Sequence, residues 1–207
     1  MGLIKKYFPE ISSDQLDLFN AMAEVYIRLN ETTNVISRQD IDQVTERHIL
    51  HSLAIAKFIE FRPGSVVLDA GTGGGFPGMP LAVMFPEVEF VLNDTILRKI
   101  RVVDEAIAEL GLANVKGVHG RMEKMKGPYD FVVSRAVAEM GWFFPRVRKS
   151  ISPEQKNAIQ NGVIYLKGGD LEKELAGFPE ARVEPISQWF EEEFFETKKV
   201  VYIGARS

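Results

Sequence analysis

Residues 68–78 read Leu68-Asp69-Ala70-Gly71-Thr72-Gly73-Gly74-Gly75-Phe76-Pro77-Gly78, and this stretch decides the fold. It completes a short apolar run over 65–70, which is typical of a strand buried on both faces of a sheet. Glycines let the backbone turn sharply and approach a ligand without Cβ clashes. Because Pro77 suits the first position of a helix, the stretch predicts a strand, a ligand-binding turn and a helix.

The alternation of strand and helix continues on the carboxyl side of this turn. Strand-like runs cover 88–93, 115–119, 129–134 and 162–167, and helical segments cover 77–85, 97–110, 138–150 and 170–176. This order predicts an α/β fold with a mostly parallel sheet covered by helices on both faces. The last runs, 182–190 and 198–205, are joined by a linker too short for a crossover helix. We therefore expect a seven-stranded sheet that ends in an antiparallel C-terminal strand pair.

The residues that precede the sheet have helical periodicity. Ser12-Ser13-Asp14 offers N-cap oxygens before one apolar stripe, and a second helix is predicted over 41–58. Arg62-Pro63-Gly64 interrupts this pattern, since proline disfavours a helical conformation at the residue before it. The predicted organisation is an N-terminal helical segment, 1–62, followed by an α/β domain, 63–207.

Composition restricts the classes of function. The chain has 207 residues, 45% of them hydrophobic, which suits one domain with a substantial core. The absence of cysteine excludes disulfides and thiolate chemistry, and it fits a cytoplasmic location. No apolar run approaches the roughly 18 residues that span a bilayer, so no membrane partner is expected. The net charge of −4 implies that any nucleic-acid contact depends on a local basic patch.

The glycine turn alone leaves the cofactor open. Gly73, Gly75 and Gly78 match the Gly-x-Gly-x-x-Gly pattern of dinucleotide enzymes, and Asp94 ends the second strand at the place of a ribose-binding carboxylate. That ribose could belong to NAD or to S-adenosylmethionine. Asp69 favours the latter, because a carboxylate there attracts a methionine ammonium group and repels a pyrophosphate. The closing antiparallel strand pair is also atypical of a dinucleotide fold.

At this point the chain resembles a known family, the bacterial 16S rRNA guanine-N7 methyltransferases called RsmG or GidB. The resemblance covers about 30–203. It is carried by Asn30 with Asn34, Arg47-His48-Ile49-Leu50, Asp69-Ala70-Gly71-Thr72-Gly73, Pro77-Gly78-Met79-Pro80-Leu81, Asp94 with Arg98-Lys99, Ser134-Arg135-Ala136 and Leu166-Lys167-Gly168. The chain departs from the family pattern at Leu29-Asn30-Glu31, where Trp-Asn-Lys is common, at His51, where Asp is common, and at Gly74, where Pro is common.

The resemblance implies a class I, Rossmann-like methyltransferase domain behind the helical segment. The implied reaction transfers a methyl group from S-adenosylmethionine to N7 of a guanine in a decoding-region loop of 16S rRNA. Guanine N7 carries a lone pair, so no general base is expected and catalysis should come from positioning. The expected partner is 16S rRNA or the small ribosomal subunit, with no DNA. A monomer is expected, because no long unpaired hydrophobic stripe is evident.

The resemblance also assigns a site. Its implied cofactor-binding residues are Gly71, Gly73, Phe76, Asp94, Met122, Glu123 and Arg135, and Arg135 is the implied catalytic residue as well. Met122 and Glu123 are expected against the adenine, mainly through backbone groups. His48 and His51 lack a third ligand at motif spacing, so no metal site is expected. His48 is instead expected to donate a hydrogen bond near the cleft or within a helix interface.

The residues alone leave three other functions open. They are a methyltransferase acting on a small molecule or protein, an NAD-dependent oxidoreductase, and an inactive adenosyl-binding module. The candidate RNA-binding patches are Arg98-Lys99-Arg101, Arg121-Lys124-Lys126, Arg146-Arg148-Lys149, Lys167 and Lys198-Lys199, with Arg28 and Arg47 as possible extensions. Each patch alone is more typical of a solvated face than of an RNA contact.

Overall fold

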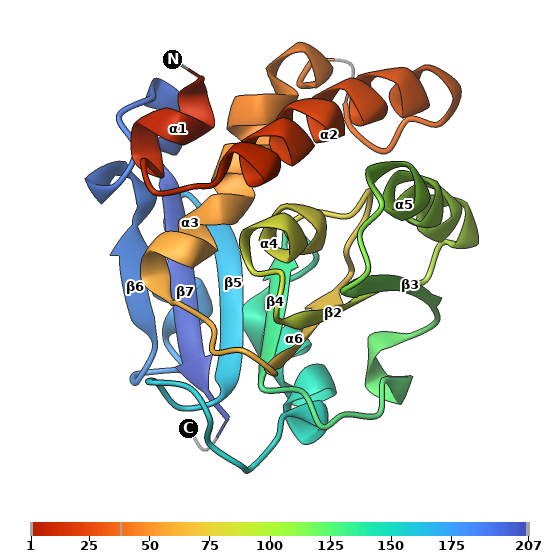
Figure 1. Cartoon of the computed structure of the whole chain (residues 1–207). Helices are drawn as coiled ribbons and strands as arrows, with labels where there is room; N and C mark the ends of the chain where they lie inside the picture. The colour runs from red at the N-terminus through yellow and green to blue at the C-terminus, as the bar shows by residue number, and fades with distance from the viewer. Residues whose placement is uncertain (1, 38, 206–207) are drawn as a thin grey trace.

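The computed structural model describes residues 2–37 and 39–205. Its centre is a seven-stranded sheet in the order β3-β2-β1-β4-β5-β7-β6 (Figure 1). The strands are β1 (Val66–Ala70), β2 (Glu89–Asp94), β3 (Val115–His119), β4 (Phe131–Arg135), β5 (Gly162–Gly168), β6 (Arg182–Pro185) and β7 (Lys198–Gly204). Strands β1 to β5 pair in parallel, whereas β7 pairs antiparallel with both β5 and β6. The predicted sheet and its antiparallel end are confirmed.

Helices cover both faces of the sheet. In Figure 1 the near face carries α1 (Leu3–Tyr7), α2 (Ser13–Thr32), α3 (His51–Phe58), α4 (Gly78–Met84) and α5 (Leu97–Leu110). Helix α6 (Met140–Val147) lies behind the sheet and contacts α7 (Glu172–Leu175). Alternate strand residues enter different cores, because Val67 packs with the near-face helices and Leu68 with α6. This alternation explains why the strands read as nearly continuous apolar runs.

Helix α2 begins as its sequence predicts. The Ser12 hydroxyl accepts from the Gln15 amide, and the Gln15 side chain returns to the Ser12 backbone in a capping box. The helix then buries Phe19, Met22 and Tyr26 against the near face of the sheet domain. The helical segment therefore shares one apolar core with the sheet.

The predicted helix over 41–58 is helical throughout but changes its type along its length. It consists of a 3-10 turn (Ile41–Gln43), a π-helical turn (Thr45–Leu50) and α3. Compared with an α-helix, a π turn changes the direction in which its side chains point, and such turns are frequent at functional sites. Here the turn and the first residue of α3 present Arg47, His48 and His51 to one cavity.

Two other boundaries differ from the prediction. The run over 182–190 is a strand only as far as Pro185, and Ile186–Gln188 forms a 3-10 turn that buries Ile186. The helix predicted over 138–150 begins at Met140 and ends in a 3-10 turn, Arg148–Ser150. The remaining short turns are Met122–Lys124 and Glu193–Phe195.

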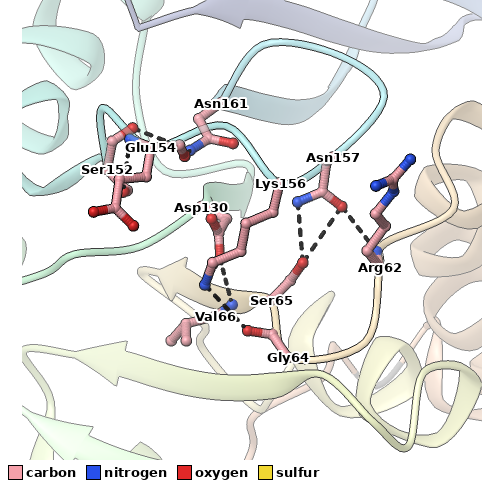
Figure 2. Close-up of polar contacts among 10 residues, drawn as sticks. All are labelled: Arg62, Gly64, Ser65, Val66, Asp130, Ser152, Glu154, Lys156, Asn157 and Asn161. Atoms are coloured by element: carbon pink, nitrogen blue, oxygen red, sulfur yellow. Dashed lines mark hydrogen bonds and ion pairs between the residues drawn. The ribbon is translucent and has the colours of Figure 1, made fainter.

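A polar network ties the linker before β1 to the loop before β5, at the amino end of the sheet (Figure 2). The Asn157 side chain accepts from the Arg62 amide at 2.8 Å and donates to the Ser65 hydroxyl at 3.0 Å. The Asp130 carboxylate accepts from the Val66 amide at 2.9 Å. These contacts fix the start of β1, whose other end carries the glycine turn.

Candidate functional site

A cavity of about 430 Å³ lies at the carboxyl ends of the parallel strands, on the glycine turn. Its floor is formed by the backbone of Gly71 to Gly74, and Asp94 and Arg135 enter from the ends of β2 and β4. The cavity is within the size range of small-molecule sites, roughly 300–1,000 Å³. Its position matches the usual ligand crevice of an open parallel sheet.

The glycine turn needs glycine at two of its positions for different reasons. Gly71 has φ 74°, and a Cβ there would collide with the Val137 side chain. Gly73 has φ 61°, but a Cβ there would meet no atom within 4 Å. Gly71 is therefore required by packing, whereas Gly73 keeps the cavity floor open.

The sequence suggested that Asp69 faces a ligand. In the structure its Oδ2 atom instead binds groups of its own turn. Its Oδ2 atom accepts from Thr72 Oγ1 at 2.6 Å and from the Gly78 amide at 2.7 Å, and the side chain is fully buried. Asp69 is not among the residues that line the cavity, and its Oδ2 atom holds the turn together, whereas its Oδ1 atom is buried without a hydrogen-bond partner among the described residues. Contact of this carboxylate with a ligand ammonium group stays a prediction. Burial raises the pKa of Asp69 to about 7.

Asp94 lines the cavity at the predicted place. Its Oδ2 accepts from the Gly73 amide at 3.0 Å, and its Oδ1 accepts from the Ile96 amide at 2.8 Å, next to the start of α5. The carboxylate thus connects the glycine turn to the following helix. Each carboxylate oxygen has a further lone pair, so acceptor capacity remains for a hydroxyl in the cavity.

Buried Phe76 and the partly buried Arg135 and His48 form one cluster at the side of the cavity. Arg135 Nη2 lies 2.8 Å from His48 Nδ1, and its guanidinium carbon lies 5.5 Å from the centre of the Phe76 ring. A guanidinium only donates, so Nδ1 of His48 accepts here and the proton of the neutral ring is on Nε2, where donation by His48 stays a prediction. Burial, followed by the Arg135 charge, lowers the pKa of His48 to about 3.

Met122 and Glu123 have different positions. Met122 is buried and lines the cavity. The Glu123 carboxylate instead pairs with Arg146 Nε at 3.0 Å and borders a separate surface depression. Only the backbone of Glu123 is left for the role that the resemblance implies.

Sequence reasoning missed several cavity residues. Trp142 and Ile96 are both exposed and border the cavity, and Val35 reaches it from the helical segment. Ala136 follows Arg135 with φ 53°, a conformation that costs a non-glycine residue about 1–2 kcal/mol. Positive φ at alanine leaves no sequence signal, and the aromatic ring of Trp142 was the one available clue.

The candidate basic patches are partly neutralised within the fold. Lys167 pairs with Glu174 at 2.7 Å and is mostly buried, so it belongs to the interior and not to an open basic surface. Arg146 is held by Glu123 and stacks on Trp142. Lys198 and Arg47 lie beside a second cavity next to Arg135, where Arg47 pairs with Asp40 at 2.7 Å.

Metal-binding clusters and membrane-spanning helices are both missing from residues 2–37 and 39–205. Within those ranges, no three His, Cys, Asp or Glu side chains are grouped to hold a metal ion. Over the same ranges, every helix is too short or too polar to cross a membrane.

Sequence comparison gives the family. The family model described as GidB, rRNA small subunit methyltransferase G, matches residues 15–199. The chain belongs to this family. It is 52% identical over 203 residues to the ribosomal RNA small subunit methyltransferase G of Christiangramia forsetii, covering 98% of this chain and 96% of the relative. It is 50% identical over 206 residues to the Cytophaga hutchinsonii protein of the same name, covering 99% and 100%. The resemblance to RsmG/GidB is therefore confirmed.

Solved structures confirm the fold class. A SAM-dependent methyltransferase from Aquifex aeolicus matches with a TM-score of 0.55 at 16% identity, over 81% of this chain and 97% of that one. A mutant of MtNAS in complex with S-adenosylmethionine matches with a TM-score of 0.55 at 14% identity, over 97% and 75%. The GidB family chain thus has the class I methyltransferase fold.

Proposed function

We propose that this chain transfers a methyl group from S-adenosylmethionine to N7 of a guanine in 16S rRNA, within a decoding-region loop of the small ribosomal subunit. Membership of the rRNA small subunit methyltransferase G family supports the reaction and the rRNA substrate. The observation that carries the proposal is structural. A cavity floored by the glycine turn is bordered by Asp94 on one side and by partly buried Arg135 on the other.

The residues of this cavity fit S-adenosylmethionine. Gly73 keeps its floor open, because a Cβ there would occupy free space in front of the turn. Asp94 presents carboxylate oxygens for the ribose hydroxyls, and buried Met122 gives an apolar surface for the adenine, with the Glu123 backbone beside it. Gly71, Gly73 and Phe76 are left for the methionine portion. When bound, the cofactor supplies a methyl group already activated on a sulfonium.

Arg135 is the residue that we assign to the reaction itself. It lines both the cofactor cavity and the second cavity, so its guanidinium lies where donor and acceptor meet. Burial lowers the pKa of Arg135 to about 10, which leaves it charged at neutral pH. The bonds to His48 and to the Arg47 carbonyl hold the guanidinium in one orientation. A guanidinium fixed there orients the base by donating a hydrogen bond to an acceptor such as guanine O6, so its role is to position N7 and not to stabilise the positive charge that moves onto the base.

No residue is assigned as a general base. N7 of guanine carries a lone pair and loses no proton when it attacks a methyl carbon. Nδ1 of the neutral His48 accepts from Arg135, so Nε2 carries the ring proton and neither nitrogen is free to act as a base. The residues of the site therefore act by positioning the base and excluding water.

We further propose that the helical segment, 1–62, and the α/β domain, 63–207, act together as a monomer in the cytoplasm, without a DNA or membrane partner. The joint lining of the second cavity by Arg47 from the helical segment and Lys198 from β7 supports the joint action of the two parts.

The test is methyl incorporation by the purified chain from labelled S-adenosylmethionine. Acceptors are small ribosomal subunits from a strain lacking the modification, naked 16S rRNA, and bulk cellular protein. The proposal expects 7-methylguanosine in the RNA after nuclease digestion. Label in protein alone, or at a different nucleoside, would contradict it, and NAD binding without S-adenosylmethionine binding in calorimetry would contradict the choice of cofactor.

A further inference from the structure

A second cavity of about 380 Å³ adjoins the cofactor cavity. The two share Arg135 and Ala136 in their walls. A molecule in the second cavity therefore lies directly beside the cofactor, which is where a methyl acceptor has to be. The cavity also falls within the size range of sites that enclose a small molecule or a flipped base, roughly 300–1,000 Å³.

The walls of this cavity suit a flat aromatic ring near a phosphate backbone. Phe194 presents a ring, and two cations lie over it, with Lys198 Nζ 4.6 Å and the Arg47 guanidinium carbon 5.5 Å from the ring centre. Aromatic faces and guanidinium planes stack on unpaired bases, and lysine ammonium groups attract phosphates. The chemical class of the ligand is therefore a nucleotide base with its backbone.

Two buried side-chain atoms in this wall have no hydrogen-bond partner. They are Nε2 of His51 and Nε of Arg47, and both residues line the second cavity. His51 is only 5% exposed. A buried polar group without a partner is costly, on the order of 1–3 kcal/mol, and in a ligand site it indicates a group that the ligand completes.

The protonation state of His51 determines whether its unpartnered Nε2 atom is a hydrogen-bond donor or an acceptor. Burial, followed by the charges of Arg135 and Lys198, lowers the pKa of His51 well below 6.5, so the ring is neutral. The ring also hydrogen-bonds the backbone of Arg47, and this contact falls to Nδ1 because Nε2 has no partner. Nδ1 is then the N–H donor, and Nε2 carries a lone pair. His51 thus presents an acceptor, whereas Arg47 Nε presents a donor.

Guanine and adenine differ at the edge that such an acceptor would read. When N7 faces the methyl donor, the opposite edge of guanine carries two donors, N1–H and the amino group. On the same N1–C2 side adenine carries N1, an acceptor, and a carbon-bound hydrogen, because its amino donor is at C6, nearer to N7. An acceptor on that side favours guanine and leaves adenine unpaired, which costs affinity.

We propose that the second cavity holds the target guanine and that Nε2 of His51 accepts a hydrogen bond from its Watson–Crick edge, which makes His51 a specificity-determining residue. This inference rests on the proposed function and adds to it a residue and a mode of base selection. It also gives the helical segment a role, since His51 begins α3 and reaches the acceptor side of the site.

The test compares His51→Phe with His51→Gln. Phenylalanine keeps a ring against Phe194 and Phe195, whose centres lie 5.4 and 6.0 Å from that of His51, but it removes the acceptor. Glutamine keeps an acceptor oxygen. Methyl transfer is measured on small subunits, with the target guanine intact or replaced by adenosine, beside S-adenosylmethionine binding by calorimetry and the melting temperature of each variant.

We expect His51→Phe to lower kcat/KM for guanine about 10- to 100-fold, as for a lost hydrogen bond of about 1.4–2.8 kcal/mol, with unchanged cofactor binding. The ratio of guanine to adenine methylation should fall as well, which a purely structural role would not produce. His51→Gln should recover part of the kcat/KM for guanine and part of the ratio of guanine to adenine methylation. Wild-type kcat/KM and base ratio in a folded His51→Phe would overturn the inference alone. No 7-methylguanosine with the wild-type chain would defeat the proposed function and the inference together.

Discussion

Arg135 Nη2 lies 2.8 Å from Nδ1 of His48, while Nη1 of the same guanidinium donates to the backbone carbonyl of Arg47 at 3.2 Å. A residue from the end of β4 is thereby held by two residues of the π turn. This contact joins the helical segment to the sheet at the wall between the two cavities. It explains how the cation is oriented although no carboxylate forms a salt bridge with it among the described residues.

Arg135→Ala should lower kcat for methyl transfer about 100-fold, because loss of a group that positions the base can misplace the reacting atoms at a cost on the order of 10² in rate. Arg135→Lys keeps a positive charge but not the two-pronged contact, so its kcat should be intermediate. The measurement is methyl incorporation into small subunits with both substrates saturating. An Arg135→Ala variant that melts like the wild type and retains its kcat would remove the residue from the mechanism.

Gly73→Ala should weaken S-adenosylmethionine binding with little effect on the fold. The new Cβ would occupy the cavity floor, and the positive φ adds about 1 kcal/mol of strain. Gly64→Ala is the matched control, since Gly64 has φ 76° and a Cβ there also meets no atom within 4 Å, but it lies at the amino end of β1. Calorimetry should show a lower affinity for Gly73→Ala only. Equal affinities for the two variants would place the cofactor elsewhere.

Asp94→Ala should raise the Kd for S-adenosylmethionine about 10- to 100-fold. The substitution removes the ribose acceptor and releases the Gly73 and Ile96 amides, and hydrogen bonds to a charged group contribute about 1.5–3 kcal/mol each. Asp94→Asn keeps one acceptor oxygen and should lose less. An unchanged Kd for Asp94→Ala would limit this carboxylate to its role in holding the turn.

The pH dependence of stability should report the burial of Asp69. Its pKa of about 7 in the fold exceeds the ordinary 3.8, so the folded chain keeps a proton that the unfolded chain loses across this window. Stability contributed by this group therefore falls as the pH rises from about 4 to 7. Asp69→Asn retains an acceptor for the Gly78 amide and does not titrate. The melting temperature of the wild type minus that of Asp69→Asn should decrease from about pH 5 to about pH 8, whereas a constant difference would show that the pKa is not raised.

The sequence could predict the order of strands and helices because that information is local. Apolar runs such as 65–70 and the capping residues around Ser12 act within a few neighbours, and the structure places them as expected. The position of Asp94 and of Arg135 followed from the rule that parallel strands end at one edge.

The direction of the Asp69 side chain, which points into its own turn, could not be predicted from the sequence. A carboxylate at a strand end is able to face a ligand or to cap its own turn, and the choice here depends on the Gly78 amide and the Thr72 hydroxyl. The second cavity could not be predicted either, because it brings together His51 and Phe194, which are far apart in the sequence. No local pattern encodes that contact.

Placement of a methyl group on N7 of one guanine in 16S rRNA is the activity on which the assigned residue roles depend. It can be tested by mass-spectrometric mapping of the 16S rRNA from cells that lack this chain, beside cells in which it is restored. We expect one 7-methylguanosine in a decoding-region loop to be missing without the chain and to return with it. An unaltered modification map in the cells that lack the chain would contradict the proposed function.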